Sequence, residues 1–72
     1  MKSIRLGIYR HYKGNRYQVI GLATHSETLE QLVVYRALYG DFGLWVRPLS
    51  MFQESIFVGD LVVQRFAYEG DK

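Results

Sequence analysis

Residues 25–52 read HSETLEQLVVYRALYGDFGLWVRPLSMF, and this stretch decides the fold class. Its centre, Val33-Val34-Tyr35, is β-branched and aromatic. Such residues favour strands because a helix restricts their side chains. Two glycines follow, and a short apolar segment then ends at Pro48, which has no amide to donate to a sheet. The stretch therefore predicts a strand at 31–38, a loop at 39–43 and a strand at 44–47.

The residues ahead of the first of these strands also fit the start of a helix. Ser26 could cap a helix with two glutamates in its first turn, and Gly40 could end it. The strand-forming centre at 33–35 argues against that alternative. We therefore expect a turn at 26–30.

The segments on the N-terminal side continue the β pattern. Residues 7–12 and 16–25 alternate in the way typical of strands, whose successive side chains point to opposite faces. Between them lies Lys13-Gly14-Asn15, and glycine and asparagine tolerate the positive φ of a tight turn. This half of the chain predicts a hairpin.

The segments on the C-terminal side predict one helical turn at 49–52 and strands at 55–58 and 61–66. Gly59-Asp60 between those strands is a hairpin signal. Five to six short strands predict a mainly β fold, either a small SH3-like barrel or a strongly curved antiparallel sheet, with at most one short helical turn. The predicted core contains Val19, Val34, Leu44, Val46, Phe52 and Val62.

Length and composition predict one small β-rich domain over residues 1–72, with loose termini at 1–6 and 69–72. The chain has no cysteine, which excludes disulfides and thiolate metal sites. Its first residues lack the apolar run of a signal peptide, and its apolar stretches are too short to cross a bilayer. We expect a cytoplasmic protein with no membrane association.

Charge is distributed unevenly along the chain. Residues 1–26 carry five basic and no acidic side chains, whereas the remaining residues carry four basic and seven acidic ones. Such asymmetry indicates a basic edge beside a more acidic remainder. The alternative is an ordinary solvated surface of mixed sign.

Several strings together resemble a known family. They are YRHYKG at 9–14, HSET at 25–28, VVYRALY at 33–39, WVRP at 45–48 and MF at 51–52. Over roughly residues 6–68 the chain is similar to a small bacterial family, domain of unknown function 1653. The resemblance implies a bacterial origin and a compact β-rich domain. It implies no activity, so no functional residue is transferred from it.

Three enzymatic interpretations of the histidines fail or lack support. His25-Ser26-Glu27 has the His-x-Glu order of zinc deaminases, but those enzymes also need cysteine ligands. A serine triad from Ser26 with His11 or His25 lacks a nucleophile-elbow sequence. The two histidines have no helical i, i+4 spacing for a metal. We therefore predict no catalytic residues, no metal and no cofactor, and we interpret 25–28 as a turn with local hydrogen bonds.

The strongest candidate site is a face of aromatic and basic side chains. Trp45 and Arg47 share one face of their strand if Leu44 and Val46 point inward, and aromatic planes stack on bases while cations attract phosphate. The alternative is a buried Trp45 with an exposed Arg47. The candidate ligand-binding residues are Arg10, Tyr12, Lys13, Arg16, Trp45 and Arg47.

These features predict a non-enzymatic binding module. Its ligand would be nucleic acid or a nucleotide, with protein–protein interaction as the alternative. Salt-sensitive binding would indicate nucleic acid, whereas an exposed apolar groove or free strand edge would indicate a protein partner. We expect a monomer or weak homodimer.

Overall fold

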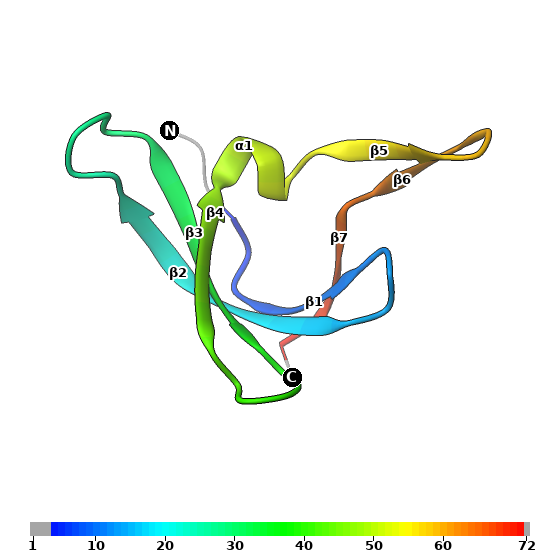
Figure 1. The fold of residues 1–72 in the computed structure, drawn as a ribbon, viewed down its shortest axis with the longest axis horizontal. Helices are drawn as coiled ribbons and strands as arrows, with labels where there is room; N and C mark the ends of the chain where they lie inside the picture. Colours follow the sequence, from blue (N-terminus) through cyan, green and yellow to red (C-terminus); the bar gives the residue numbers. More distant parts are fainter. Residues whose placement is uncertain (1–3, 72) are drawn as a thin grey trace.

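The computed structural model describes residues 4–71 and consists mainly of antiparallel strands (Figure 1). Within those residues there are seven strands and one short helix. Their order is β1 (Gly7–His11), β2 (Arg16–Thr24), β3 (Gln31–Ala37), β4 (Leu44–Pro48), α1 (Leu49–Phe52), β5 (Ser55–Val58), β6 (Leu61–Gln64) and β7 (Phe66–Gly70). The predicted strand at 31–38 is confirmed, and the alternative helix after Ser26 is wrong.

The strands form two separate sheets. Five of them make one antiparallel sheet in the order β4-β3-β2-β1-β7, and β5 pairs only with β6. A barrel requires hydrogen bonds between its first and last strands. Here β4 pairs only with β3 and β7 only with β1 among the described strands, so the predicted SH3-like barrel is wrong and the antiparallel-sheet alternative holds.

The segment predicted as one strand at 61–66 is divided at Arg65 between β6 and β7. The Arg65 amide donates to the Glu54 carbonyl at 3.0 Å, and its carbonyl accepts from the Tyr12 amide at 3.0 Å. These bonds tie the bend to both the helix end and the first hairpin. The chain then continues as β7, whose last residue, Gly70, was predicted to be loose but pairs with Ile8 of β1; residues 1–3 and 72 lie outside the described part.

The core lies on the inner side of the curved sheet and is largely aromatic. Its buried cluster consists of Tyr9, Val19, Val33, Tyr35, Leu49, Phe52 and Phe66. The rings of Phe52 and Phe66 stack with centroids 4.0 Å apart, and Tyr9 meets Phe52 edge-on at 5.3 Å. Such pairs each contribute about 0.5–1.5 kcal/mol beyond area burial. The short helix α1 thus packs Leu49 and Phe52 against the sheet.

Two predicted core residues, Val19 and Phe52, are confirmed. The other four are not buried in the structure. Val34 is only half-buried. Leu44, Val46 and Val62 are exposed, so their assignment to the core is wrong. In β3 the inward residues are Val33, Tyr35 and Ala37, and the ladder partners of Tyr35 and Val34 are Trp45 and Val46. Because cross-strand partners share a face, Val46 points outward with Val34.

The β5–β6 hairpin extends away from the five-stranded sheet as a separate arm (Figure 1). Its apolar side chains are largely exposed, with Phe57 reaching 77%. Val62 is therefore exposed because no other element in the described part of the chain covers the apolar side chains of this hairpin. Across residues 4–71, no helix has the length and apolar character required to span a membrane.

Candidate ligand-binding face

The six residues predicted to bind ligand do not share one face of the sheet. Arg10 and Arg16 are ladder partners next to the inward pair Tyr9–Tyr17, so strand alternation points them away from the core. Both guanidinium groups bind Glu69, each with an Nε–O distance of 2.9 Å. The structure therefore separates these two arginines from Trp45 and Arg47.

Glu69 offsets part of the basic charge that the sequence placed in the first hairpin. Partial burial alone would raise the pKa of its carboxyl, but the hydrogen bonds and charges of Arg10 and Arg16 outweigh this and hold the pKa below the usual range. One carboxylate serves two guanidinium groups, so a surplus positive charge remains. Glu69 lies on the C-terminal strand. The charge pattern of the sequence did not indicate that this strand meets the basic segment.

Of the remaining four predicted residues, Trp45 and Arg47 lie on the inner side of the sheet, whereas Tyr12 and Lys13 lie in the turn that follows β1. The His11 ring contacts Tyr12 at 4.6 Å and Phe66 at 4.9 Å, and Lys13 Nζ lies 5.8 Å from the Tyr12 ring centroid. The guanidinium of Arg47 lies 5.7 Å from the Phe66 ring. Ring contacts therefore connect Lys13 in this turn to Arg47 on the inner side.

At its β4 end this side opens into a small cleft, here called the Trp45 cleft. Its volume is about 180 Å³, and it is lined by Tyr17, Tyr35, Tyr39, Trp45 and Arg47. Tyr35 is a buried floor residue opposite Trp45 in the ladder, whereas Trp45 is 57% exposed. The alternative that Trp45 belongs to the core is therefore wrong.

Two of the tyrosines that line the Trp45 cleft are joined by a hydrogen bond. The hydroxyls of Tyr17 and Tyr39 are hydrogen-bonded at 2.9 Å. Burial, this hydrogen bond and the neighbouring phenols raise the pKa of Tyr17 to about 12. A phenol is already neutral at physiological pH, and the raised pKa keeps Tyr17 neutral in alkaline solution as well, so Tyr17 adds no negative charge that would repel an anionic ligand.

The cationic part of the inner side is concentrated around Arg47. No carboxylate within residues 4–71 forms an ion pair with it, whereas Arg65 pairs with Glu54 at 2.8 Å. Burial lowers the pKa of His11, and the charges of Arg47, Arg65 and Lys13 lower it further. Burial is the larger cause of the lowered pKa, and the additional lowering by three cations shows that His11 lies in a region of positive potential.

The HSET segment forms a turn, as predicted. His25 Nδ1 accepts hydrogen bonds from the amides of Glu27 at 3.1 Å and Thr28 at 3.3 Å, and the Thr28 hydroxyl accepts from the Glu30 amide at 3.2 Å. The turn is thus held by its own side chains. In the described part of the chain, no three histidine or carboxylate side chains gather into a metal-binding group.

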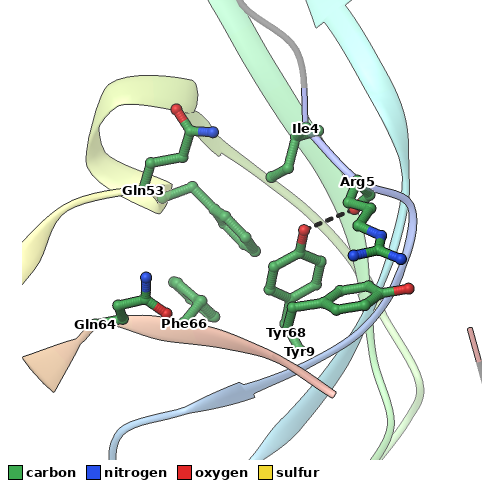
Figure 2. Close-up of a pocket in the computed structure, with 8 residues that line it drawn as sticks. Ile4, Arg5, Tyr9, Gln53, Gln64, Phe66 and Tyr68 are labelled. Atoms are coloured by element: carbon green, nitrogen blue, oxygen red, sulfur yellow. Dashed lines mark hydrogen bonds between the residues drawn. The ribbon is translucent and has the colours of Figure 1, made fainter. Parts of the chain in front are cut away.

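Sequence reasoning missed a second cavity, here called the Arg5 pocket (Figure 2). Its volume is about 320 Å³, and its lining residues are Ile4, Arg5, Tyr9, Phe52, Gln53, Gln64, Phe66 and Tyr68. They come from the N-terminal segment, β1, α1 and its C-cap, β6 and β7. No local pattern connects these segments, because only the fold brings them together.

Comparisons with known proteins agree with this architecture. The sequence model of the family DUF1653, described as a protein of unknown function, matches residues 7–68. The crystal structure of a protein belonging to DUF1653 from Bordetella bronchiseptica is similar, with 42% sequence identity and a TM-score of 0.88. That match covers 96% of this chain and 91% of the other. No curated protein matches the sequence.

Proposed function

This chain belongs to the DUF1653 family, whose description names no activity, and we propose that it is a non-enzymatic module that binds single-stranded nucleic acid. The observation that carries the proposal is the exposed indole of Trp45 beside Arg47, which has no carboxylate partner in residues 4–71. The cysteine-free sequence suits a reducing compartment, so we place this binding in the cytoplasm.

The Trp45 cleft supplies both interactions that a single strand requires. Trp45 and Tyr39 offer exposed ring faces on which bases can stack, and such stacking is tolerant of sequence because every base has a π-face. Arg47 offers a cation for phosphate, and Lys13 continues the positive charge beyond the Phe66 and His11 rings. No acidic side chain is among the described residues that line the cleft.

The two arginines of the first hairpin should contribute least to this binding. Arg10 and Arg16 are bound to Glu69 on the opposite face, so their positive charge is partly cancelled and points away from the cleft. Affinity should therefore depend more on Arg47 and Lys13 than on Arg10. Each lost phosphate contact lowers the slope of log affinity against log salt by about 0.7 for a single strand.

Fluorescence anisotropy with a labelled single-stranded RNA tests the proposal at about 20 and 150 mM salt. We expect binding that weakens as salt rises, and Trp45→Ala should lose roughly 1–3 kcal/mol of binding free energy per stacked base while remaining folded. The matched control is Phe57→Ala, another exposed aromatic that lies on the hairpin arm. Absence of binding at low salt, or equal losses in both variants, would reject the nucleic-acid proposal.

A second candidate function, association with a second copy of this chain, is favoured by the β5–β6 arm. The arm exposes Phe57, Val58, Leu61 and Val62. Beneath it runs a groove of about 420 Å³, lined by Arg10, His11, Tyr12, Val58, Leu61, Val63, Gln64, Ala67 and Glu69. Exposed apolar patches of this kind mark interaction sites.

Charge complementarity indicates that the occupant of this groove is another copy. Asp60 at the tip of the arm has no ion-pair partner within residues 4–71. The groove includes Arg10, which shares the single carboxylate of Glu69 with Arg16 and leaves a surplus cation. Each copy therefore supplies an apolar arm with an acidic tip and an apolar groove that is lined by Arg10 and Glu69 and bordered by Arg16, so one arm can lie in the groove of the other copy as a two-fold interface requires.

Sedimentation velocity over a range of concentrations tests this second candidate. The wild type should show a concentration-dependent dimer that Leu61→Asp abolishes and Asp60→Lys weakens, with Asp41→Lys as a charge-matched control in the 39–43 loop. A monomer at all concentrations, or a dimer unaffected by Leu61→Asp, would exclude the arm as the interface.

A further inference from the structure

The Arg5 pocket has two chemically different ends separated by a floor of rings. Figure 2 shows the amide side chains of Gln53 and Gln64 at one end and Arg5 with Tyr68 at the other. Phe66 lies between these ends and stacks on Phe52. A ligand that spans the pocket would thus contact amides, then aromatic rings, then a guanidinium group.

The floor is rigid because its rings also belong to the core. Tyr9 contacts Phe52 and Tyr68 edge-on, with centroids 5.3 and 5.2 Å apart. The Tyr9 hydroxyl donates to the Arg5 carbonyl at 2.7 Å, which holds the segment carrying Arg5 beside the pocket. Tyr9 and Phe66 are only 7% and 5% exposed, so this floor offers a planar ligand narrow ring edges, not open faces, and does so without the need to rearrange.

The guanidinium end is suited to an anion. The Arg5 guanidinium lies 4.5 Å from the centroid of the Tyr68 ring, and no carboxylate in residues 4–71 forms an ion pair with it. Tyr68 is itself held in place, because its hydroxyl donates to Asp71 Oδ1 at 2.7 Å. The guanidinium also hydrogen-bonds the Tyr68 hydroxyl, and its remaining N–H groups are of the kind that bind phosphate or carboxylate.

We propose that the Arg5 pocket binds a nucleoside monophosphate. The base would lie along the exposed edges of the Phe66 and Tyr9 rings with its donor and acceptor edge towards Gln64, since glutamine amides pair with adenine edges. The phosphate would lie at Arg5. The pocket volume of about 320 Å³ falls within the range of small-ligand sites. This site is separate from the Trp45 cleft, and its ligand is either a free nucleotide or the phosphorylated end of a strand.

NMR titration of the ¹⁵N-labelled full chain with adenosine 5′-monophosphate tests the proposal. We expect saturable shifts of the amides that surround the pocket: Tyr9, Phe52, Gln53, Gln64, Phe66 and Tyr68. Adenosine, which lacks the phosphate, should bind about tenfold more weakly, because a charge-assisted pair with Arg5 is lost. No saturable shift at these residues, or shifts confined to the Trp45 cleft, would overturn the proposal.

Two variants test which end of the ligand each side of the pocket contacts. Arg5→Ala should weaken the monophosphate about tenfold and adenosine hardly at all, because it removes only the phosphate contact. Gln64→Ala should weaken both ligands alike. The controls are Arg36→Ala and Gln18→Ala, ladder partners on the outer face. Retained spectral dispersion shows that each variant is folded, and an Arg5→Ala variant that weakens both ligands equally would contradict the phosphate assignment.

A third comparison identifies the source of the nucleotide. A free nucleotide is the ligand if the monophosphate binds more tightly than a 5′-phosphorylated trinucleotide, and a strand end is the ligand if the order is reversed. In either case the 5′-hydroxyl trinucleotide should bind more weakly than its phosphorylated form; equal binding would overturn the proposal. Trp45→Ala separates the two sites, because it should impair the strand and leave the monophosphate shifts unchanged.

Discussion

Val33 shows how completely one aliphatic side chain can be enclosed in a domain of this size. It is 0% exposed and lies in the core cluster. Val46, on the neighbouring strand β4, is 59% exposed. Val33→Ala should lower the free energy of unfolding by about 2 kcal/mol, from lost transfer energy plus a cavity. Urea denaturation measures the change. The control Val46→Ala should change stability by less than about 0.5 kcal/mol, and equal effects would contradict the observed faces.

His11 makes stability depend on pH near neutrality. Burial and nearby cations lower its pKa below 6.5, and its Nδ1 accepts the Lys13 amide at 3.2 Å, which requires an unprotonated nitrogen. As pH falls below about 6.5 the unfolded chain gains a proton before the folded protein does, so protonation favours unfolding. The stabilisation is complete above that pH and is lost as pH falls through the folded pKa.

The measurement is the free energy of unfolding from about pH 8 to pH 5 for the wild type and His11→Gln. We expect a shallower decline in the variant, since its position 11 cannot titrate. The comparison also removes the background of His25 and the carboxylates, which both proteins share. Identical declines would show that His11 does not carry the dependence.

At the scale of elements, the junction of β1 and β7 depends on a glycine. Gly7 has φ +136°, and a Cβ at this position would overlap the carbonyl oxygen of Gly70. Pairing of β1 with β7 is irregular just after it, between Ile8 and Tyr9. Gly7→Ala should therefore cost roughly 1–3 kcal/mol of stability or more, because the strain falls on backbone that cannot move freely.

Gly21→Ala is the matched control for this junction. Gly21 lies inside β2, and a Cβ there would meet no atom within 4 Å. We expect no loss of stability, or a small gain from the restricted unfolded chain. Thermal denaturation of both variants compares them directly, and a larger loss at Gly21 would contradict the structure.

At the scale of the whole molecule, stability should differ between the curved sheet and the arm. The sheet carries the buried cluster, whereas β5 and β6 pair only with each other and expose most of their apolar side chains. Native-state hydrogen exchange should show that the amides of β5 and β6 open at lower free energy than those of β2 and β3. The hairpin amides would have to exchange as slowly as the central strands for this expectation to fail.

Local sequence alone was sufficient for most of the elements. The β-branched run at 33–35, the alternation in the first hairpin, the glycine-bounded turns and Pro48 act over a few residues, so strands β1 to β4 and the helical turn were predictable. Alternation also placed Trp45 and Arg47 on one face, which the cleft confirms. An i, i+2 relation in a strand requires no knowledge of the rest of the fold.

The tertiary structure decided which face is the inside and what each charge meets. A period of two defines two sets of side chains but does not say which set is buried. Here the rings of Phe52 and Phe66 arrive from later in the chain and cover Val33 and Tyr35, so Leu44 and Val46 turn outward. Core packing is collective, and no local pattern encodes it.

The same physical reason applies to the candidate sites. Glu69 reaches Arg10 and Arg16 only because β7 pairs with β1, and the Arg5 pocket exists only where five separate segments meet. The sequence by itself determined the strands, the turns and the Trp45–Arg47 pair, because those depend on neighbours along the chain. The open sheet, the partly neutralised arginines and the second pocket depend on contacts across more than 50 residues, such as the 59 between Arg10 and Glu69, and only folding establishes those.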